Sequence, residues 1–130
     1  MNDTMKQARL RGTHAVAKLA ALLAGLAFAS AAFAHVFPQK QEPGAGATVA
    51  SPAQVRVMFD GPLEAAFSSL TVTDASGKEV NTEKGTVDEH QRALITVPLP
   101  TLVAGRYTVH WVAVASDGHR THGDYAFNVK

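Results

Sequence analysis

An acidic side chain and two imidazoles lie close together near the end of the chain, in residues 116–123. Asp117 and His119 are separated by Gly118, and glycine permits the tight backbone bends that bring such side chains together. Carboxylate oxygens and imidazole nitrogens are hard or borderline metal ligands, and a plane of nitrogen and oxygen donors is what Cu(II) favours. Asp-Gly-His is also a common turn composition, so this stretch alone does not decide between a metal site and a turn.

The beginning of the chain favours the metal interpretation. Basic residues precede an apolar run over residues 19–34, which ends in Ala32-Phe33-Ala34. A basic region, a short apolar region and an Ala-x-Ala end are typical of a secretory signal peptide. The run is shorter than the roughly 20 residues of a membrane-spanning helix. We therefore expect residues 1–34 to be a cleaved signal peptide and residues 35–130 to be the mature domain, with an uncleaved anchor or cleavage after Ala29 as alternatives.

Cleavage after Ala34 would make His35 the first residue of the mature chain. A terminal histidine offers an amine and an imidazole, and α-amino groups have reference pKa values of about 7.7 to 8.0, so the amine is available as a ligand. With Asp117 and His119 it would complete three nitrogens and one oxygen. We expect one Cu(II) per mature chain, held by His35, Asp117 and His119. A Cu(I) site needs thioether or thiolate ligands, and Met58 is the only methionine after residue 34.

Composition excludes several other classes of function. Residues 35–130 contain eight Lys and Arg and ten Asp and Glu, a net charge near −2, with no basic stripe for nucleic acid. The chain has no cysteine, so disulfides, zinc–thiolate sites and thiol chemistry are absent. We expect one domain, monomeric, that does not insert into the membrane after signal cleavage.

Short strands with turn signals between them run through the mature chain. Residues 54–59 alternate between apolar and polar with a period of two, as in a half-buried strand. Residues 63–69 are expected to form a loop or one helical turn, and residues 81–91 an exposed loop. The other expected strands are a short one after Val36 and residues 70–73, 78–80, 92–97, 106–115 and 124–129. About seven strands predict an all-β, immunoglobulin-like antiparallel β-sandwich with Greek-key connections.

The longest predicted strand indicates where the acidic and imidazole groups should lie. Tyr107, Val109, Trp111 and Ala113 share one face, which we expect to be the core. The same alternation continued would place Asp117 and His119 in this inward row, at one end of the sandwich. Gly105-x-Tyr107 also resembles the tyrosine corner of such sandwiches, with an ordinary turn as the alternative.

The other histidines have simpler expected roles. His110 falls on the face opposite the core and is expected at the surface. His90 lies in an acidic loop and is expected to be solvated. His122 is left open between an additional ligand, a supporting hydrogen-bond donor and an exposed residue.

These features together resemble the CopC family of periplasmic copper-resistance proteins over essentially the whole mature chain. The matching elements are His35, Pro43-Gly44, Phe59 with Leu63 and Phe67, Leu102-x-x-Gly105-x-Tyr107-x-x-x-Trp111 and Ser116-Asp117-Gly118-His119-x-x-x-Gly123. The resemblance implies a small β-sandwich that binds Cu(II) through the amine and side chain of His35, Asp117 and His119. It also implies a CopD-like copper transporter in the inner membrane as partner. Family members commonly carry an acidic residue at position 61, where this chain has Gly61; Asp60 or His122 would have to take over its support of the copper site.

The expected function is therefore Cu(II) binding in the periplasm for copper resistance and homeostasis, by sequestration or by delivery to the transporter. Four ligands in the copper plane leave little room for a substrate, so we expect no catalysis. One alternative is a small copper oxygenase with a histidine brace, since such enzymes also begin at an N-terminal histidine. The other is a metal-free sandwich module for protein interaction.

Overall fold

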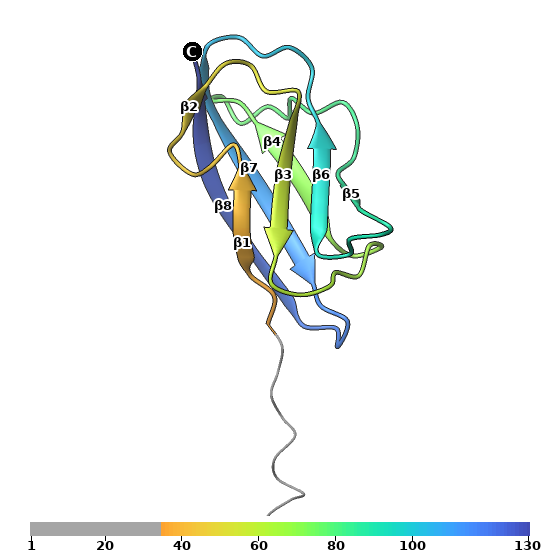
Figure 1. The fold of residues 1–130 in the computed structure, drawn as a ribbon. Helices are drawn as coiled ribbons and strands as arrows, with labels where there is room; N and C mark the ends of the chain where they lie inside the picture. Colours follow the sequence, from red (N-terminus) through yellow and green to blue (C-terminus); the bar gives the residue numbers. More distant parts are fainter. Residues whose placement is uncertain (1–34) are drawn as a thin grey trace, which may run out of the picture. The chain divides into compact units, whose positions relative to one another are not determined.

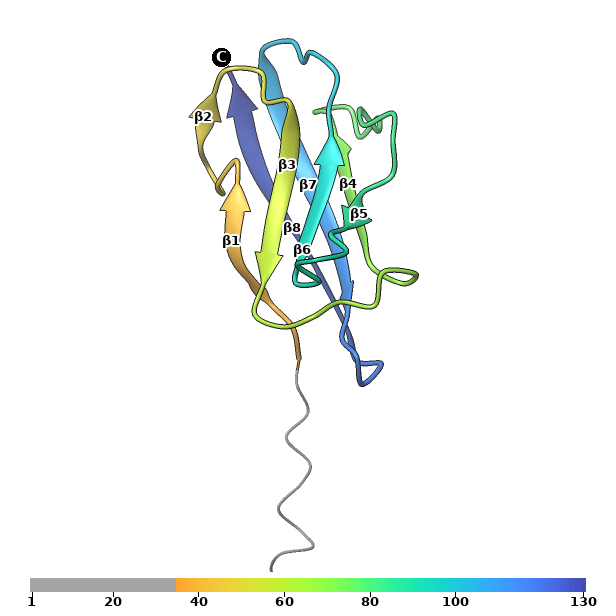
Figure 2. The same cartoon turned by 45° about the vertical axis from the view of Figure 1, so that its right-hand side comes forward.

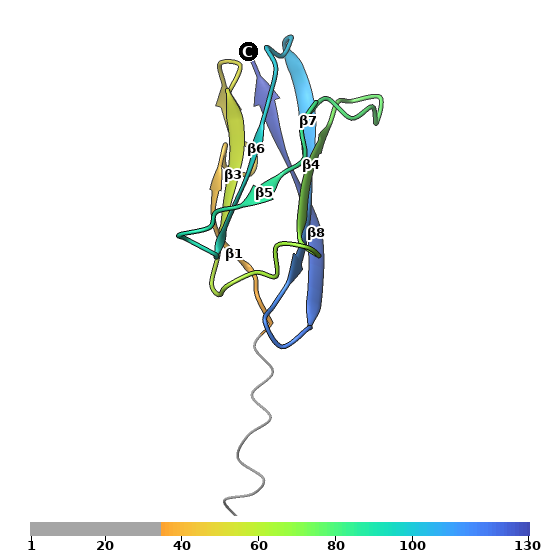
Figure 3. The ribbon, with the colours of Figure 1, turned by 90° about the vertical axis from the view of Figure 1, so that its right-hand side faces the viewer.

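The computed structural model describes residues 35–130, which form two facing β-sheets of four strands each (Figures 1, 2 and 3). The first sheet has the order β1 (Pro38–Glu42), β3 (Gln54–Phe59), β6 (Leu94–Pro98) and β5 (Thr86–Val87). The second has the order β2 (Thr48–Val49), β8 (Arg120–Val129), β7 (Gly105–Val114) and β4 (Ser69–Thr73). The predicted fold class, an immunoglobulin-like β-sandwich, is confirmed. Its strands pair antiparallel as predicted except for β2, which pairs parallel with β8. The predicted signal peptide and its cleavage site lie outside the described residues, and within residues 35–130 no helix is long and apolar enough to span a membrane.

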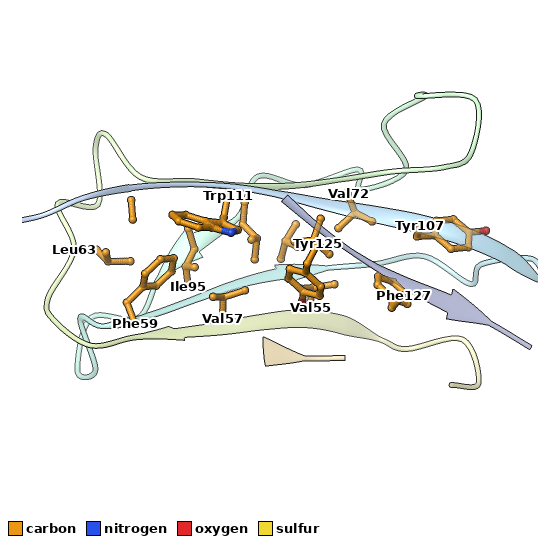
Figure 4. Close-up of a cluster of buried hydrophobic side chains, with 14 of the residues drawn as sticks. Val55, Val57, Phe59, Leu63, Val72, Ile95, Tyr107, Trp111, Tyr125 and Phe127 are labelled. Carbon is orange, nitrogen blue, oxygen red and sulfur yellow. The ribbon is translucent and has the colours of Figure 1, made fainter. Parts of the chain in front are cut away.

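The core lies between the two sheets and follows from the period-two pattern of the strands. β3 buries Val55, Val57 and Phe59, as its alternation predicts. The Phe59 and Trp111 rings meet edge to face, with centroids 5.4 Å apart, at one end of the cluster (Figure 4). Trp111 lies directly over Gly123, its partner on β8, where an added Cβ would come within 2.6 Å of the indole. Glycine at 123 is therefore required by the position of the indole.

The tyrosine corner is present. The Tyr107 hydroxyl donates a hydrogen bond to the Val103 carbonyl, four residues upstream, at 2.7 Å. This bond ties the loop before β7 to the start of that strand, as in other sandwiches of this type. The alternative of an ordinary turn is therefore wrong.

Two elements between β4 and β6 differ from the prediction. Residues 78–80 do not form a strand; they make a single bridge, Thr73 with Glu79, and a backbone hydrogen bond from Val80 to Val72. Residues 81–91 are not wholly an exposed loop, because β5 pairs there with β6. A two-residue strand is too short to show periodicity, which is why the pattern missed it.

The last hairpin is longer than predicted. β8 starts at Arg120 rather than at Asp124, so β7 and β8 are joined by a short turn over residues 115–119. Hydrogen bonds from Ala115 N to His119 O and from Gly118 N to Ala115 O, both 2.9 Å, close this turn. Gly118 has a φ of 87°, a conformation that favours glycine. The turn of the Asp-Gly-His stretch thus lies at the end of the sandwich, close to the segment that leads into β1 (Figure 1).

Candidate metal site

Asp117 contacts His119 through both of its carboxylate oxygens. Oδ1 accepts a hydrogen bond of 3.0 Å from the His119 backbone N–H, and Oδ2 lies 3.0 Å from Nδ1 of the His119 ring. The hydrogen bond from the backbone holds the pKa of the Asp117 carboxyl below its ordinary value, and the adjacent ring acts in the same direction. Both side chains are a little over one third exposed. The turn thus presents an ionised carboxylate and an oriented imidazole at the surface.

His119 reaches the inner side of the sandwich through β8, not through β7. The predicted inward row of β7 ends at the turn, because the strand stops at Val114. Counting back along β8 in steps of two, Tyr125, Gly123 and Thr121 point to the core side, and His119 immediately precedes the strand in the same row. The expectation that Asp117 and His119 continue the β7 row is therefore corrected: Asp117 belongs to the turn and His119 to the row of β8.

His35 lies beside His119 in space, although the two are at opposite ends of residues 35–130. Their ring centroids are 5.4 Å apart and the rings are inclined at 48°. The Phe37 ring flanks His35 edge-on, with centroids 6.3 Å apart. The fold therefore brings together the three residues that the sequence predicts as metal ligands.

The segment after His35 is anchored at three points. Val36 is buried in the core, and its carbonyl accepts a hydrogen bond of 2.6 Å from the Thr121 hydroxyl. Phe37 N donates to Asp60 Oδ1 at 2.8 Å, and Asp60 N donates to the Phe37 carbonyl at 3.0 Å. Sequence reasoning missed Thr121, which counting back along β8 from Tyr125 would have placed on the inner face. Asp60 was considered as a substitute for the family's acidic residue, and here its carboxylate binds the backbone of Phe37.

Gly61 leaves room for Val36. A Cβ at position 61 would come within 3.0 Å of Val36 Cγ1, so a larger residue would require the valine to shift. Position 61 therefore carries no acidic side chain, and Val36 packs closely against it in the segment that carries His35.

The remaining histidines lie elsewhere. His110 is on the outer face of β7, as predicted, but it is not simply solvated: Nδ1 lies 2.7 Å from Asp124 Oδ1 and Nε2 lies 2.9 Å from Thr73 Oγ1. His122 is exposed and, by the alternation of β8, on the face opposite His119. His90 is exposed in its loop, as predicted.

The side chains of His35, Asp117 and His119 lie close together but do not form a preformed metal site. Within residues 35–130, no three His, Asp or Glu side chains are arranged as a ready-made metal site. The His119 ring faces Asp117 through Nδ1, so joint coordination requires either that Oδ2 moves away from this nitrogen or that His119 binds through Nε2. The donor set itself, imidazole nitrogens and a carboxylate oxygen, suits Cu(II).

The family model described as the CopC domain matches residues 39–130. The chain belongs to the CopC family. A protein of Escherichia coli named copper resistance protein C is 33% identical over 116 residues, which cover 84% of this chain and 90% of that protein. The match includes the strands and the turn that build the end of the sandwich described above.

Two solved structures of CopC-family proteins share the fold. CopC from Methylosinus trichosporium OB3b matches with a TM-score of 0.69 and 35% identity, over 74% of this chain and 94% of that one. PcoC from Escherichia coli, described as a methionine-rich copper resistance protein, matches with a TM-score of 0.63 and 30% identity, over 75% and 100% of the two chains. This CopC-family chain is not methionine-rich, because Met58 is the only methionine in residues 35–130.

Proposed function

We propose that this chain is a periplasmic Cu(II)-binding protein of copper resistance and homeostasis. It binds one Cu(II) per mature chain through His35, Asp117 and His119, and either sequesters the ion or delivers it to an inner-membrane copper transporter of the CopD type. The observation that carries the proposal is the placement of the His35 ring 5.4 Å from the His119 ring, with Asp117 against His119.

The ligand chemistry depends on removal of residues 1–34. In the precursor the nitrogen of His35 is part of a peptide bond, and an amide nitrogen has no basic lone pair. After cleavage behind Ala34, the same nitrogen becomes an amine that can bind copper together with the His35 imidazole. These two donors belong to one residue, so binding the second costs little additional entropy. Signal cleavage would therefore create the site as well as release the protein.

The exposure of the site supports a binding and transfer role. The Asp117 and His119 side chains are 38% and 39% exposed, so a second protein has access to the ligands. A plane already filled by protein ligands is unsuited to binding a substrate, which favours ion storage or transfer over catalysis.

The test compares residues 35–130 that begin with a free His35 with a variant carrying one additional Gly in front of it. We expect the native form to bind one Cu(II), with quenching of Trp111 fluorescence, and the extended form to bind at least 100-fold more weakly, about 3 kcal/mol. His119→Ala should weaken binding to a similar extent. His90→Ala, in an exposed loop, is the matched control and should have no effect. Equal Cu(II) affinity of the native and Gly-extended forms would show that His35 is not the anchor of the site.

A further inference from the structure

The two residues that follow His35, Val36 and Phe37, are bound from both sheets of the sandwich. From the second sheet, Thr121 on β8 donates its hydroxyl to the Val36 carbonyl at 2.6 Å. From the first sheet, Asp60, directly after β3, makes two hydrogen bonds with the backbone of Phe37. Val36 itself is only 3% exposed and belongs to the hydrophobic core. In the proposed mature chain this is a tight attachment for a segment directly beside the N-terminus, where fraying is the ordinary behaviour.

Thr121 belongs to the same row of β8 as His119. His119 directly precedes β8, two positions before Thr121, so the alternation of the strand continued back by one residue directs both toward the segment that contains His35. The start of β8 and the residue directly before it therefore provide the hydroxyl that holds Val36 and an imidazole next to His35. This bond fixes the carbonyl directly after His35, and the His35 ring lies 5.4 Å from the His119 ring.

We propose that Thr121 and Asp60 are positioning residues that hold His35 against His119 before a metal ion arrives. The expected consequence, tighter Cu(II) binding, rests on the proposed function. The positioning of His35 is a property of the metal-free protein. A ligand that is held in place before binding does not lose conformational freedom when the ion binds, so affinity rises without any new contact to the ion.

Asp60 acts in this arrangement as a hydrogen-bond acceptor rather than as a charge. Its Oδ1 already accepts the Phe37 N–H at 2.8 Å, and an amide oxygen would accept the same bond. Asp60→Asn should therefore preserve the position of His35, whereas Asp60→Ala should release it. If the carboxylate acted on copper through its charge, the Asn and Ala variants would be equally impaired.

The experiment uses residues 35–130 with a free His35 and compares Thr121→Val, Thr121→Ser and Thr108→Val. Thr121→Val keeps the shape of the side chain and removes the hydroxyl, and Thr121→Ser restores it. Thr108→Val is the matched control, since Thr108 pairs with Ala126, well away from Thr121 along the same two strands. The metal-free readouts are the nuclear Overhauser effect between the His35 and His119 rings and hydrogen exchange of the Phe37 amide. The metal readout is a competition titration with Cu(II), together with its electron paramagnetic resonance spectrum.

We expect Thr121→Val to lose the ring-to-ring effect, to exchange the Phe37 amide faster and to bind Cu(II) about tenfold more weakly, with recovery in Thr121→Ser. Thr108→Val should behave as the unmodified protein in every readout. A Thr121→Val protein that keeps the ring-to-ring effect and the native affinity would overturn the inference. If the unmodified protein shows no Cu(II) binding but Thr121→Val still loses the ring-to-ring effect, the proposed function fails while the positioning role stands.

Discussion

At the scale of single residues, the two carboxylate oxygens of Asp117 make two different contacts with His119. Oδ1 closes the turn by accepting the His119 backbone N–H, and Oδ2 faces the His119 ring. Carboxylates commonly orient metal-binding imidazoles in this way, by pairing with the ring nitrogen that does not bind the metal. In the proposed copper site, Asp117 would act either as a ligand or by orienting His119, and both roles require it to be ionised.

The protonation states of these residues set a pH dependence. In the proposed site, copper would have to displace protons from an α-amine and imidazoles, groups with reference pKa values near 7.8 and 6.5. The pKa of Asp117 is lowered, chiefly by the His119 backbone N–H, so this carboxylate is already ionised throughout that range. We expect Cu(II) affinity to fall steadily from about pH 8 to about pH 5, in competition titrations at constant ionic strength.

Asp117→Asn provides the comparison for this profile. The amide can still accept the backbone hydrogen bond but carries no charge, so affinity should drop at every pH while the slope between pH 8 and 5 stays the same. An affinity that does not vary over this window would rule out the amine and imidazole ligands.

At the scale of elements, the tyrosines of the β7–β8 hairpin differ in whether the hydroxyl has a hydrogen-bond partner. The Tyr107 hydroxyl holds the loop before β7 through Val103. Tyr125 on β8 is buried, and within the described residues its hydroxyl has no hydrogen-bond partner. Burial also raises the pKa of the Tyr125 hydroxyl, so it stays neutral at any ordinary pH.

The two tyrosines should therefore respond in opposite ways to removal of the hydroxyl. Tyr107→Phe should lower the free energy of unfolding by about 1 kcal/mol, since it loses a formed hydrogen bond. Tyr125→Phe should be neutral or stabilising, because a buried polar group without a partner is removed. Urea denaturation of the two variants measures the difference. A larger loss for Tyr125→Phe than for Tyr107→Phe would contradict this account.

Some strands could be predicted from the sequence alone and others could not. Strand β3 was predicted with its observed bounds, because six residues of clean alternation define both its length and its buried face. β5 was missed because two residues carry no period, and the start of β8 was placed too late because His122 and Gly123 interrupt the apolar pattern. The placement of His35 beside His119 was a hypothesis, because it depends on which strands are neighbours. The period of the apolar pattern does not give the order of the strands in a sheet.

At the scale of the whole domain, several exposed carboxylates share a response to acid. The pKa values of four of them are lowered: Glu42 chiefly by the Lys40 side chain, Asp74 by the Ser76 hydroxyl, Asp88 by the Gln91 backbone N–H and Asp117 by the His119 backbone N–H. A lowered pKa in the folded state means that the unfolded chain binds protons more readily. The stability from these groups is therefore present above the unfolded pKa, near 4, and is lost as the pH falls through the folded values.

We expect the urea midpoint to decline below about pH 4 for this reason. An Asp74→Asn, Asp88→Asn double variant keeps oxygens that can accept the turn hydrogen bonds but has no charge to titrate. Its midpoint should be lower at neutral pH and should decline less steeply in acid. A double variant with the same acid profile as the unmodified protein would show that these turns do not contribute to it.

The parallel pairing of β2 with β8 has a practical consequence for handling the protein. Lys130 N donates to the Val49 carbonyl at 2.9 Å, so the end of the chain is fastened to the sandwich just after β8. That end lies away from the start of β1 and from the turn between β7 and β8 (Figure 1). A linker attached at Lys130 would anchor the domain to an electrode or bead with His35, Asp117 and His119 facing the liquid. If His35 binds copper through a free amine, as proposed, an affinity tag in front of it would block that amine, and the domain would serve as a copper probe only when immobilised from its C-terminal side.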